Sequence, residues 1–145
     1  MTVDTSRPFT VVTQFPTDDS GTLSEFRRLY VQDGNVIQNS VATPSSYPQV
    51  NAIDDDYCEY AGGSEFLRLG ATQGMGEAMA RDMVLSVSVW WDNSTYMNWL
   101  DSGSAGPCGA TEGTPANITA NQPDTAVTFN NIKWGEIGST YLKCK

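Results

Sequence analysis

The chain has 145 residues, of which 17 are acidic, 8 are basic and none is histidine, so its formal net charge is −9 at pH 7. This length predicts one domain, and the acidic balance leaves no basic patch for nucleic acid or an anionic membrane. The absence of histidine excludes histidine triads and histidine-ligated metal sites, and no apolar run reaches transmembrane length. The charge fits a neutral polymer or a small neutral ligand better than nucleic acid or an anionic membrane. We expect no cofactor.

Strand patterns dominate the first part of the chain. Residues 9–15 (FTVVTQF) alternate apolar and polar side chains and are rich in β-branched residues, which predicts a half-buried strand. Residues 25–32 and 35–38 flank an Asp-Gly dipeptide, which is a strong hairpin signal. Residues 39–61 are polar and contain prolines and three successive aspartates, so they predict a long loop.

The second part mixes one short helix with further strands. The later half of residues 66–81 predicts a short amphipathic helix, weakened by three glycines. Residues 83–90 (MVLSVSVW) have the best strand pattern, and residues 126–134 (AVTFNNIKW) predict a final strand. Residues 102–123 are rich in Gly, Ser, Pro and Asn and predict a loop. About five strands and one short helix indicate an antiparallel β-sandwich.

The most informative segment is 87–101 (VSVWWDNSTYMNWLD). Trp90 and Trp99 are nine positions apart, and short polar side chains such as Asp92 and Asn93 lie between them. An indole face stacks on the C–H face of a pyranose ring, while carboxylates and amides bind its hydroxyls. The composition therefore favours a sugar-binding cleft, with core packing as the alternative, because a single Trp is more often a core residue.

The termini and the cysteines indicate a piece of a longer protein. The N-terminal residues have neither a charged nor an apolar region of the kind that makes a signal peptide. Cys58, Cys108 and Cys144 are odd in number and form no CxxC pair, so neither a complete disulfide set nor a zinc site is expected. The alternative is three reduced cytosolic thiols. Sequons at Asn93 and Asn117 are possible N-glycosylation sites and favour a secreted parent.

Several motifs, taken in order, resemble the C-terminal third of glycoside hydrolase family 7: TVVTQF, RRLYVQDGNVIQNS, IDDDYC, GMGEAMARDMVLSVSVWWDNSTYMNWLDSG, AGPCGATEGTPANI and FNNIKWGEIGST. The resemblance spans residues 3–141. It implies an all-β fold, namely a portion of a concanavalin-like β-jelly-roll sandwich with long loops and one short helix. Residues 1–145 would be the C-terminal part of one catalytic domain of a secreted cellulase, and the expected partner is cellulose or a related β-1,4-glucan.

The resemblance also predicts a subtype. Cellobiohydrolases of the family carry a long insertion after the second tryptophan, which helps to roof a tunnel. Here Trp99 is joined to Cys108 by a short connection, and Ser94 stands where tunnel-forming members tend to carry a bulky aromatic side chain. Both features resemble the open-cleft endoglucanases, which cut in the middle of a glucan chain.

The catalytic carboxylates of the family are not found in the chain. Retaining glycosidases need two carboxyl groups about 5–5.5 Å apart, and the family takes them from a Glu-x-Asp-x-x-Glu strand motif. None of the six glutamates has an aspartate two positions later and a glutamate five positions later. The only dense carboxylate group is Asp54-Asp55-Asp56 with Glu59, for which a solvated turn is favoured over a catalytic pair. We therefore expect no catalytic residue in this chain.

The resemblance assigns substrate-binding roles to matching positions. Trp90 would stack on a glucosyl unit on the non-reducing side of the cut, and Trp99 on the unit just past it. Asp92 and Asn93 could reach sugar hydroxyls. Trp134 is expected to pack in the final strand and to be more buried than either cleft tryptophan.

Cys58 and Cys108 match family cysteines whose disulfide partners lie outside this chain. Trp91 replaces the polar residue usual at its position. The expected function is a C-terminal fragment of a secreted endo-β-1,4-glucanase that is inactive alone. The alternatives are a stand-alone β-glucan-binding module and a non-functional truncated product, and nothing within the chain decides between these two.

Overall fold

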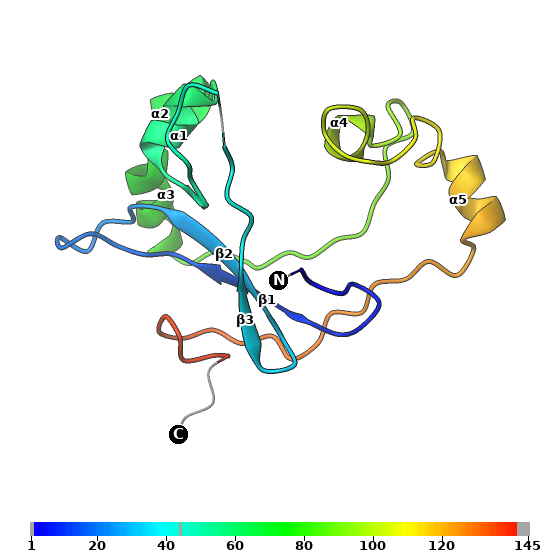
Figure 1. Ribbon diagram of the computed structural model, residues 1–145. Coiled ribbons are helices and arrows are strands. Elements are labelled where there is room, and N and C mark those ends of the chain that lie inside the picture. The colour runs from blue at the N-terminus through cyan, green and yellow to red at the C-terminus, as the bar shows by residue number, and fades with distance from the viewer. Residues whose placement is uncertain (1, 44, 142–145) are drawn as a thin grey trace. The chain divides into compact units, whose positions relative to one another are not determined.

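A computed structural model describes residues 2–43 and 45–141 (Figure 1). The backbone forms two compact units, residues 1–84 with 133–145, and residues 85–132. The first unit carries the sheet and three helices, and the second carries two short helices. Among the described residues no helix is long and apolar enough to span a bilayer.

The sheet of the first unit is antiparallel throughout. Its central strand β2 pairs on one side with β1 and on the other with β3, and the two-residue strand β4 also pairs with β2. The strands are β1 (Thr10–Gln14), β2 (Phe26–Gln32), β3 (Asn35–Gln38) and β4 (Ala52–Ile53). The alternating pattern of residues 9–15 therefore predicted β1 correctly.

The turn between β2 and β3 confirms the predicted hairpin. Gln32 pairs with Asn35, which leaves a two-residue loop. Asp33 and Gly34 both have left-handed backbones, with φ of 52° and 76°. Two successive left-handed residues match the right-handed twist of the strands, and the Asp-Gly dipeptide tolerates that conformation.

Side chains on both faces of the sheet contribute to a small hydrophobic core. Val12 lies opposite Leu29 on one face, and Ile37 lies opposite Tyr30 on the other. Val12, Leu29 and Ile37, together with Leu23, are the buried hydrophobic side chains of the described residues. Four such residues make a small core for a chain of 145 residues.

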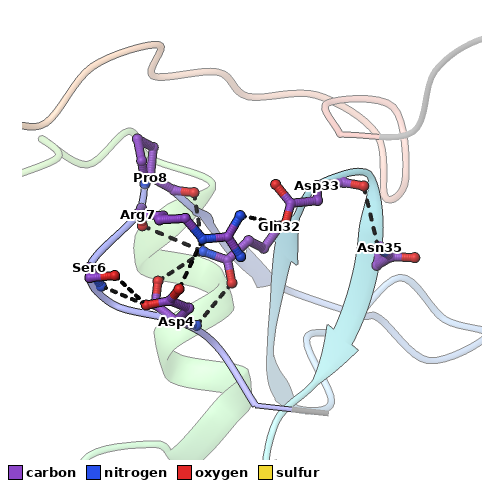
Figure 2. A network of polar contacts seen from close by, with 7 residues as sticks. All are labelled: Asp4, Ser6, Arg7, Pro8, Gln32, Asp33 and Asn35. Carbon is purple, nitrogen blue, oxygen red and sulfur yellow. Dashed lines mark hydrogen bonds and ion pairs between the residues drawn. The ribbon is translucent and has the colours of Figure 1, made fainter.

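The N-terminal segment is tied to the hairpin by polar contacts (Figure 2). The buried Gln32 side chain accepts a hydrogen bond from the Asp4 N–H and donates one to the Asp4 carbonyl, both at 2.9 Å. The Arg7 guanidinium contacts the carboxylates of Asp4 and Asp33, each at 2.9 Å. Gln32 therefore satisfies its buried amide through the backbone of Asp4, as a buried polar group requires.

Three helices follow the sheet and lie close together in Figure 1. They are α1 (Asp55–Tyr60), α2 (Ser64–Arg68) and α3 (Ala71–Met79). The predicted helix in the later half of residues 66–81 is confirmed by α3. The prediction of an uninterrupted loop over 39–61 was wrong, because Asp54 caps α1 by accepting the Tyr57 N–H at 2.8 Å and so starts a helix.

A glycine brings α3 against the strand connection. A Cβ atom added at Gly76 would lie 2.7 Å from the Cβ of Leu23. Only a residue without a side chain fits at that distance. The glycine that weakened the helix prediction is therefore the residue that allows α3 to cover Leu23.

The second unit contains α4 (Asn98–Asp101) and α5 (Pro115–Asn121). Helix α5 lies in the segment predicted as a loop. Its start is set by Thr114, whose hydroxyl accepts the Asn117 N–H at 3.2 Å, and by Pro115 in the first turn.

The two strands predicted over 83–90 and 126–134 are not paired in this structure. Their residues belong to no strand, helix or turn, and all are exposed. Alternation of side chains predicts an extended backbone, but a strand also needs a neighbour for its N–H and C=O groups. No described segment provides that neighbour, so both predictions were wrong for this chain by itself.

Candidate functional site

All four predicted substrate-binding residues lie in the unit formed by residues 85–132. Trp90 and Trp99 keep 61% and 59% of their surface exposed, so both indoles are open to a ligand. Trp90 belongs to segment 83–90, which is unpaired and exposed throughout, so its exposure does not separate the cleft prediction from the core alternative.

Trp90 and Trp91 belong to opposite faces of the extended segment. Successive side chains of an extended backbone alternate between two sides. Trp90 therefore shares its side with Ser86 and Ser88, while Trp91 shares its side with Val87 and Val89. The indole of Trp90 stands on a small polar face, whereas Trp91 continues an apolar face.

Asp92 organises the loop that joins Trp90 to Trp99. One carboxylate oxygen accepts the N–H groups of Ser94 and Thr95, at 2.8 and 3.2 Å, and the other accepts the Thr95 hydroxyl. The Thr95 hydroxyl is the main cause of a lowered Asp92 pKa, followed by the two N–H groups, because these donors stabilise the ionised form. Contact between Asp92 and a sugar hydroxyl stays a prediction.

A sharp backbone turn places Trp99 on α4. Tyr96 and Met97 both have left-handed backbones, with φ of 58° and 64°. Met97 is the N-cap of α4, so Trp99 is the second residue of a single-turn helix. Two adjacent non-glycine residues in this region are uncommon, and such conformations occur where the surrounding structure imposes them.

Contacts to the following loop hold α4. The Asn98 side-chain amide donates to the carbonyl of Ala110 at 3.0 Å. A Cβ added at Gly113 would lie 2.1 Å from the carbonyl oxygen of Tyr96, so the loop passes directly against the turn before α4. The Oδ1 atom of Asn98 is buried and has no hydrogen-bond partner within the described ranges.

The predicted short connection after Trp99 is compact. The N–H of Cys108 donates to the carbonyl of Asp101 at 2.9 Å, and Ser102 forms a parallel bridge with Cys108. A Cβ at Gly106 would lie 2.5 Å from the Asp101 carbonyl oxygen, so the path requires glycine there. The connection thus folds back onto the end of α4.

The two sequons differ in their surroundings. Asn93 is exposed, and its side chain makes no hydrogen bond to any described residue. Asn117 is half-buried, and its amide donates to the carbonyls of Thr111 and Glu112 at 3.4 and 3.3 Å. Asn93 therefore has the more accessible amide.

Cys58 and Cys108 are free thiols, and each is half-buried. Burial is the first cause that raises the pKa of Cys58, and the charges of Asp55 and Asp54 add to it. Cys144 lies outside the described residues.

The aspartate cluster has structural partners. Asp54 caps α1, and Asp55 accepts the N–H and the hydroxyl of the buried Thr72 at 3.0 and 3.1 Å. Asp56 and Glu59 are exposed. The interpretation as a solvated turn was therefore wrong for the first two carboxylates, which fix the starts of α1 and α3.

Trp134 is 95% exposed, more than Trp90 or Trp99. The prediction that it would be the most buried of the three was wrong. Its expected neighbour Ile132 is also exposed, at 65%. Residues that share one face of a lone segment cannot bury each other without an opposing layer.

Sequence analysis missed a polar depression of about 200 Å³ on the sheet. Gln14 borders it and donates from its side-chain amide to the Tyr141 hydroxyl at 3.1 Å. Two successive arginines, Arg27 and Arg28, also line it. Their adjacency in a chain with only 8 basic residues is the signal that could have drawn attention to it.

Comparison with known families assigns the chain to a family. The family described as glycosyl hydrolase family 7 matches residues 1–141. The chain belongs to glycosyl hydrolase family 7. Endoglucanase 1 of Humicola insolens is 52% identical over 139 residues, which cover 96% of this chain and 35% of that protein. The chain therefore spans about a third of the length of this curated relative and is a partial endoglucanase-like region of the family.

Solved structures agree with this assignment. A double mutant of the Humicola insolens endocellulase EGI superposes with a TM-score of 0.92 at 50% identity, over 99% of this chain and 36% of that chain. An endoglucanase I complexed with cellobiose gives 0.78 at 50% identity, over 83% of this chain and 30% of that one. The predicted fold class is confirmed, because the chain has the fold of a portion of the β-jelly roll of family 7 cellulases. The described residues contain five short helices where one was predicted.

Proposed function

We propose that this chain is the C-terminal part of the catalytic domain of a secreted, retaining endo-β-1,4-glucanase. In this proposal residues 1–145 all belong to that one domain, and they supply two tryptophan platforms to its glucan cleft. The match of glycosyl hydrolase family 7 to residues 1–141 is the observation that carries the proposal, and Trp90 and Trp99 are exposed at 61% and 59%. Each indole is free to stack on an apolar sugar face, as amphipathic aromatic side chains do in binding sites.

The two platforms take different glucosyl units. Trp90 stacks on a unit on the non-reducing side of the cut, and Trp99 stacks on the unit just past it. Asn93 is exposed and can donate to or accept from a hydroxyl. Asp92 can add an acceptor, although its carboxylate already receives three bonds from its own loop. The solved endoglucanase I complexed with cellobiose supports a β-1,4-glucan as the ligand class.

Catalysis in this proposal depends on carboxylates supplied by the rest of the domain. No glutamate of the chain fits the Glu-x-Asp-x-x-Glu pattern, and a retaining mechanism needs a nucleophile and an acid/base on opposite sides of the bond. The chain alone is inactive. Cys58 and Cys108, free here, find their disulfide partners in the rest of the domain.

The proposal includes secretion of the parent protein, which the two sequons support. Exposed Asn93 is an accessible glycan acceptor, and Asn117 is a second one whose amide is already bonded. A glycan on Asn93 would occupy the loop between the two tryptophans, so this residue serves either as acceptor or as sugar ligand.

A stand-alone β-glucan-binding module is the second candidate, because the platforms are exposed in a chain without the catalytic motif. Titration of the chain with cellohexaose, followed by tryptophan fluorescence, tests the platforms themselves. Loss of binding in Trp90→Ala, with binding kept in Trp91→Ala, supports a cleft role. The genomic sequence before Met1 then separates the two candidates, because a Glu-x-Asp-x-x-Glu motif in frame identifies a catalytic domain.

A further inference from the structure

The connection that leads to Trp99 is closed by local hydrogen bonds that begin at Asp92. The Asp92 carboxylate accepts the N–H groups of Ser94 and Thr95, at 2.8 and 3.2 Å, and the Thr95 hydroxyl. The carbonyl of Asp92 also accepts the N–H of Tyr96 at 3.1 Å. Asp92 therefore binds the backbone of this loop through both its side chain and its main chain.

The hydrogen bonds continue from this loop into α4. The Thr95 carbonyl accepts the N–H of Asn98 at 3.0 Å, and the Asn98 carbonyl accepts that of Ser102 at 3.2 Å. Between these bonds lie the left-handed residues Tyr96 and Met97. Such conformations persist where the surrounding structure imposes them. The hydrogen bonds on either side of the turn supply that constraint, and α4 begins directly after it.

A second set of contacts holds α4 from the following loop. The side-chain amide of Asn98 donates to the carbonyl of Ala110 at 3.0 Å. Gly113 passes so close that a Cβ atom there would lie 2.1 Å from the Tyr96 carbonyl oxygen. Trp99 follows Asn98 directly on this helix. Its backbone is therefore held from both sides, although 59% of its surface is exposed.

The Asp92 carboxylate also interacts with the ring of Trp99, whose only hydrogen-bond donor is the indole N–H. The Thr95 hydroxyl is first among the donors that lower the pKa of Asp92, and the side chain of Trp99 is the last of them. An ionised carboxylate has roughly four lone-pair sites, and the donors from Ser94, Thr95 and Trp99 number four. A sugar hydroxyl could bond to this carboxylate only by displacing one of these donors.

We infer that Asp92 is a positioning residue for Trp99: its carboxylate holds the loop that leads to α4 and accepts the indole N–H, so the indole is ordered before a sugar arrives. The inference rests on the proposed glucan-binding role of Trp99 and deepens it, because it assigns the affinity of that subsite partly to a residue other than the platform. Ordering a side chain on binding costs affinity, whereas a preordered side chain avoids this cost. All residues involved lie in the unit formed by residues 85–132.

The contact between Asp92 and Trp99 can be observed without a ligand. The chain has four tryptophans, and the indole N–H signal of Trp99 in a proton–nitrogen NMR spectrum is the one that disappears in Trp99→Phe. Asp92→Asn keeps one oxygen for the backbone N–H groups but loses an acceptor, so this signal should move upfield and exchange faster with water. Asp101→Asn removes the same charge from α4 and should leave the signal in place. An unchanged signal in Asp92→Asn would overturn the inference.

Binding of cellohexaose to the 145-residue chain then separates a positioning residue from a sugar ligand. Asp92→Asn should weaken the affinity by about three- to tenfold, the scale of ordering one side chain on binding. In a Trp99→Ala background the same change should have no further effect, whereas in a Trp90→Ala background it should keep its full effect. Thr95→Ser should retain the affinity and Thr95→Val should lower it, because only serine keeps the hydroxyl donor. This pair leaves Asp92 in place and tests the same contact if Asp92→Asn does not fold.

The remaining outcomes separate the inference from the proposed function. A loss of affinity that persists in the Trp99→Ala background would make Asp92 a direct sugar ligand and overturn the inference. An equal loss in Asp101→Asn would reduce the effect to net charge and overturn it as well. Absence of cellohexaose binding in the wild-type chain would contradict the proposed function, and the indole signal would still decide whether Asp92 positions Trp99.

Discussion

Asp55 binds Thr72 through both of its carboxylate oxygens. One accepts the backbone N–H at 3.0 Å and the other accepts the hydroxyl at 3.1 Å. Thr72 is only 4% exposed, so its donors have no access to water and depend on this carboxylate. The contact joins the first residue of α1 to the first turn of α3.

Removal of this contact should destabilise the chain. Asp55→Ala leaves two buried donors unsatisfied and should lower the free energy of unfolding by about 1–3 kcal/mol. The double mutant Asp55→Ala with Thr72→Val should lose less free energy than the sum of the two single mutants, because both changes remove the bond between the Thr72 hydroxyl and Asp55. Urea unfolding of the single and double mutants measures the coupling. Asp56→Ala is the control, since Asp56 is exposed on the same helix, and an equal effect there would contradict the assignment.

Local turn chemistry made part of the fold predictable. An Asp-Gly dipeptide between two strand-like runs specifies a two-residue hairpin without knowledge of the tertiary structure. The missed helices had readable local signals as well: Asp54 precedes α1, Thr114 precedes α5, and Pro115 is the first residue of α5. Those signals were outweighed by the polar composition around them, which is typical of loops as well as of exposed short helices.

Pairing of strands was not predictable from the local pattern. Segments 84–91 and 126–134 have the alternation of strands, yet pairing depends on a partner that may be far away in sequence or on another chain segment. For the same reason the burial of Trp134 was predicted wrongly, since burial requires an opposing layer. Trp90 lies in the first of these unpaired segments, so its exposure has the same cause as that of Trp134.

The isolated chain should not hydrolyse carboxymethyl cellulose faster than a buffer blank. It lacks the Glu-x-Asp-x-x-Glu motif, and general acid–base catalysis requires a positioned pair of carboxyl groups. Release of reducing ends over a long incubation measures the rate. A turnover number of about 1 per second or more would contradict the expectation and direct attention to Asp56 and Glu59.

Cys58 should react slowly with thiol reagents at neutral pH. Burial and the negative charges of Asp55 and Asp54 raise its pKa, so less thiolate is present at a given pH. In a variant with Cys108→Ser and Cys144→Ser, the rate of reaction with a disulfide reagent should rise at higher pH than for a cysteine in an uncharged peptide blocked at both ends. Asp55→Asn should move the rate profile back toward lower pH. A profile at or below that of the blocked peptide would exclude the raised pKa.

The loop around Asp92 should lose order only in acid. Its carboxyl pKa is lowered by the Thr95 hydroxyl and by the N–H groups of Ser94 and Thr95. A lowered pKa means that the contribution to stability is present above the ordinary aspartate pKa and is lost as the pH falls through the lowered value. Amide resonances of Ser94 and Thr95 should therefore shift below the ordinary aspartate range, about pH 4. Asp92→Asn keeps one oxygen acceptor and should remove this pH dependence.

Trp90 and Trp99 should act on ligand binding and not on folding. Because Trp90 and Trp99 are 61% and 59% exposed, replacement by alanine removes little buried surface. Each substitution should weaken cellohexaose binding by about 1–3 kcal/mol, a scale taken from aromatic stacking on flat ring ligands. Melting temperatures should stay close to the wild-type value. In the intact parent, Trp99→Ala should weaken cellobiose inhibition, while Trp90→Ala should raise the KM for oligosaccharides that need its subsite.

Trp91 gives the internal control for this experiment. It is the neighbour of Trp90 and is 56% exposed, but it lies on the apolar face of the extended segment. Trp91→Ala should therefore leave the affinity for cellohexaose unchanged in the isolated chain. A loss of stability without altered binding in Trp90→Ala or Trp99→Ala would instead place those two residues in the core and defeat their role as sugar platforms.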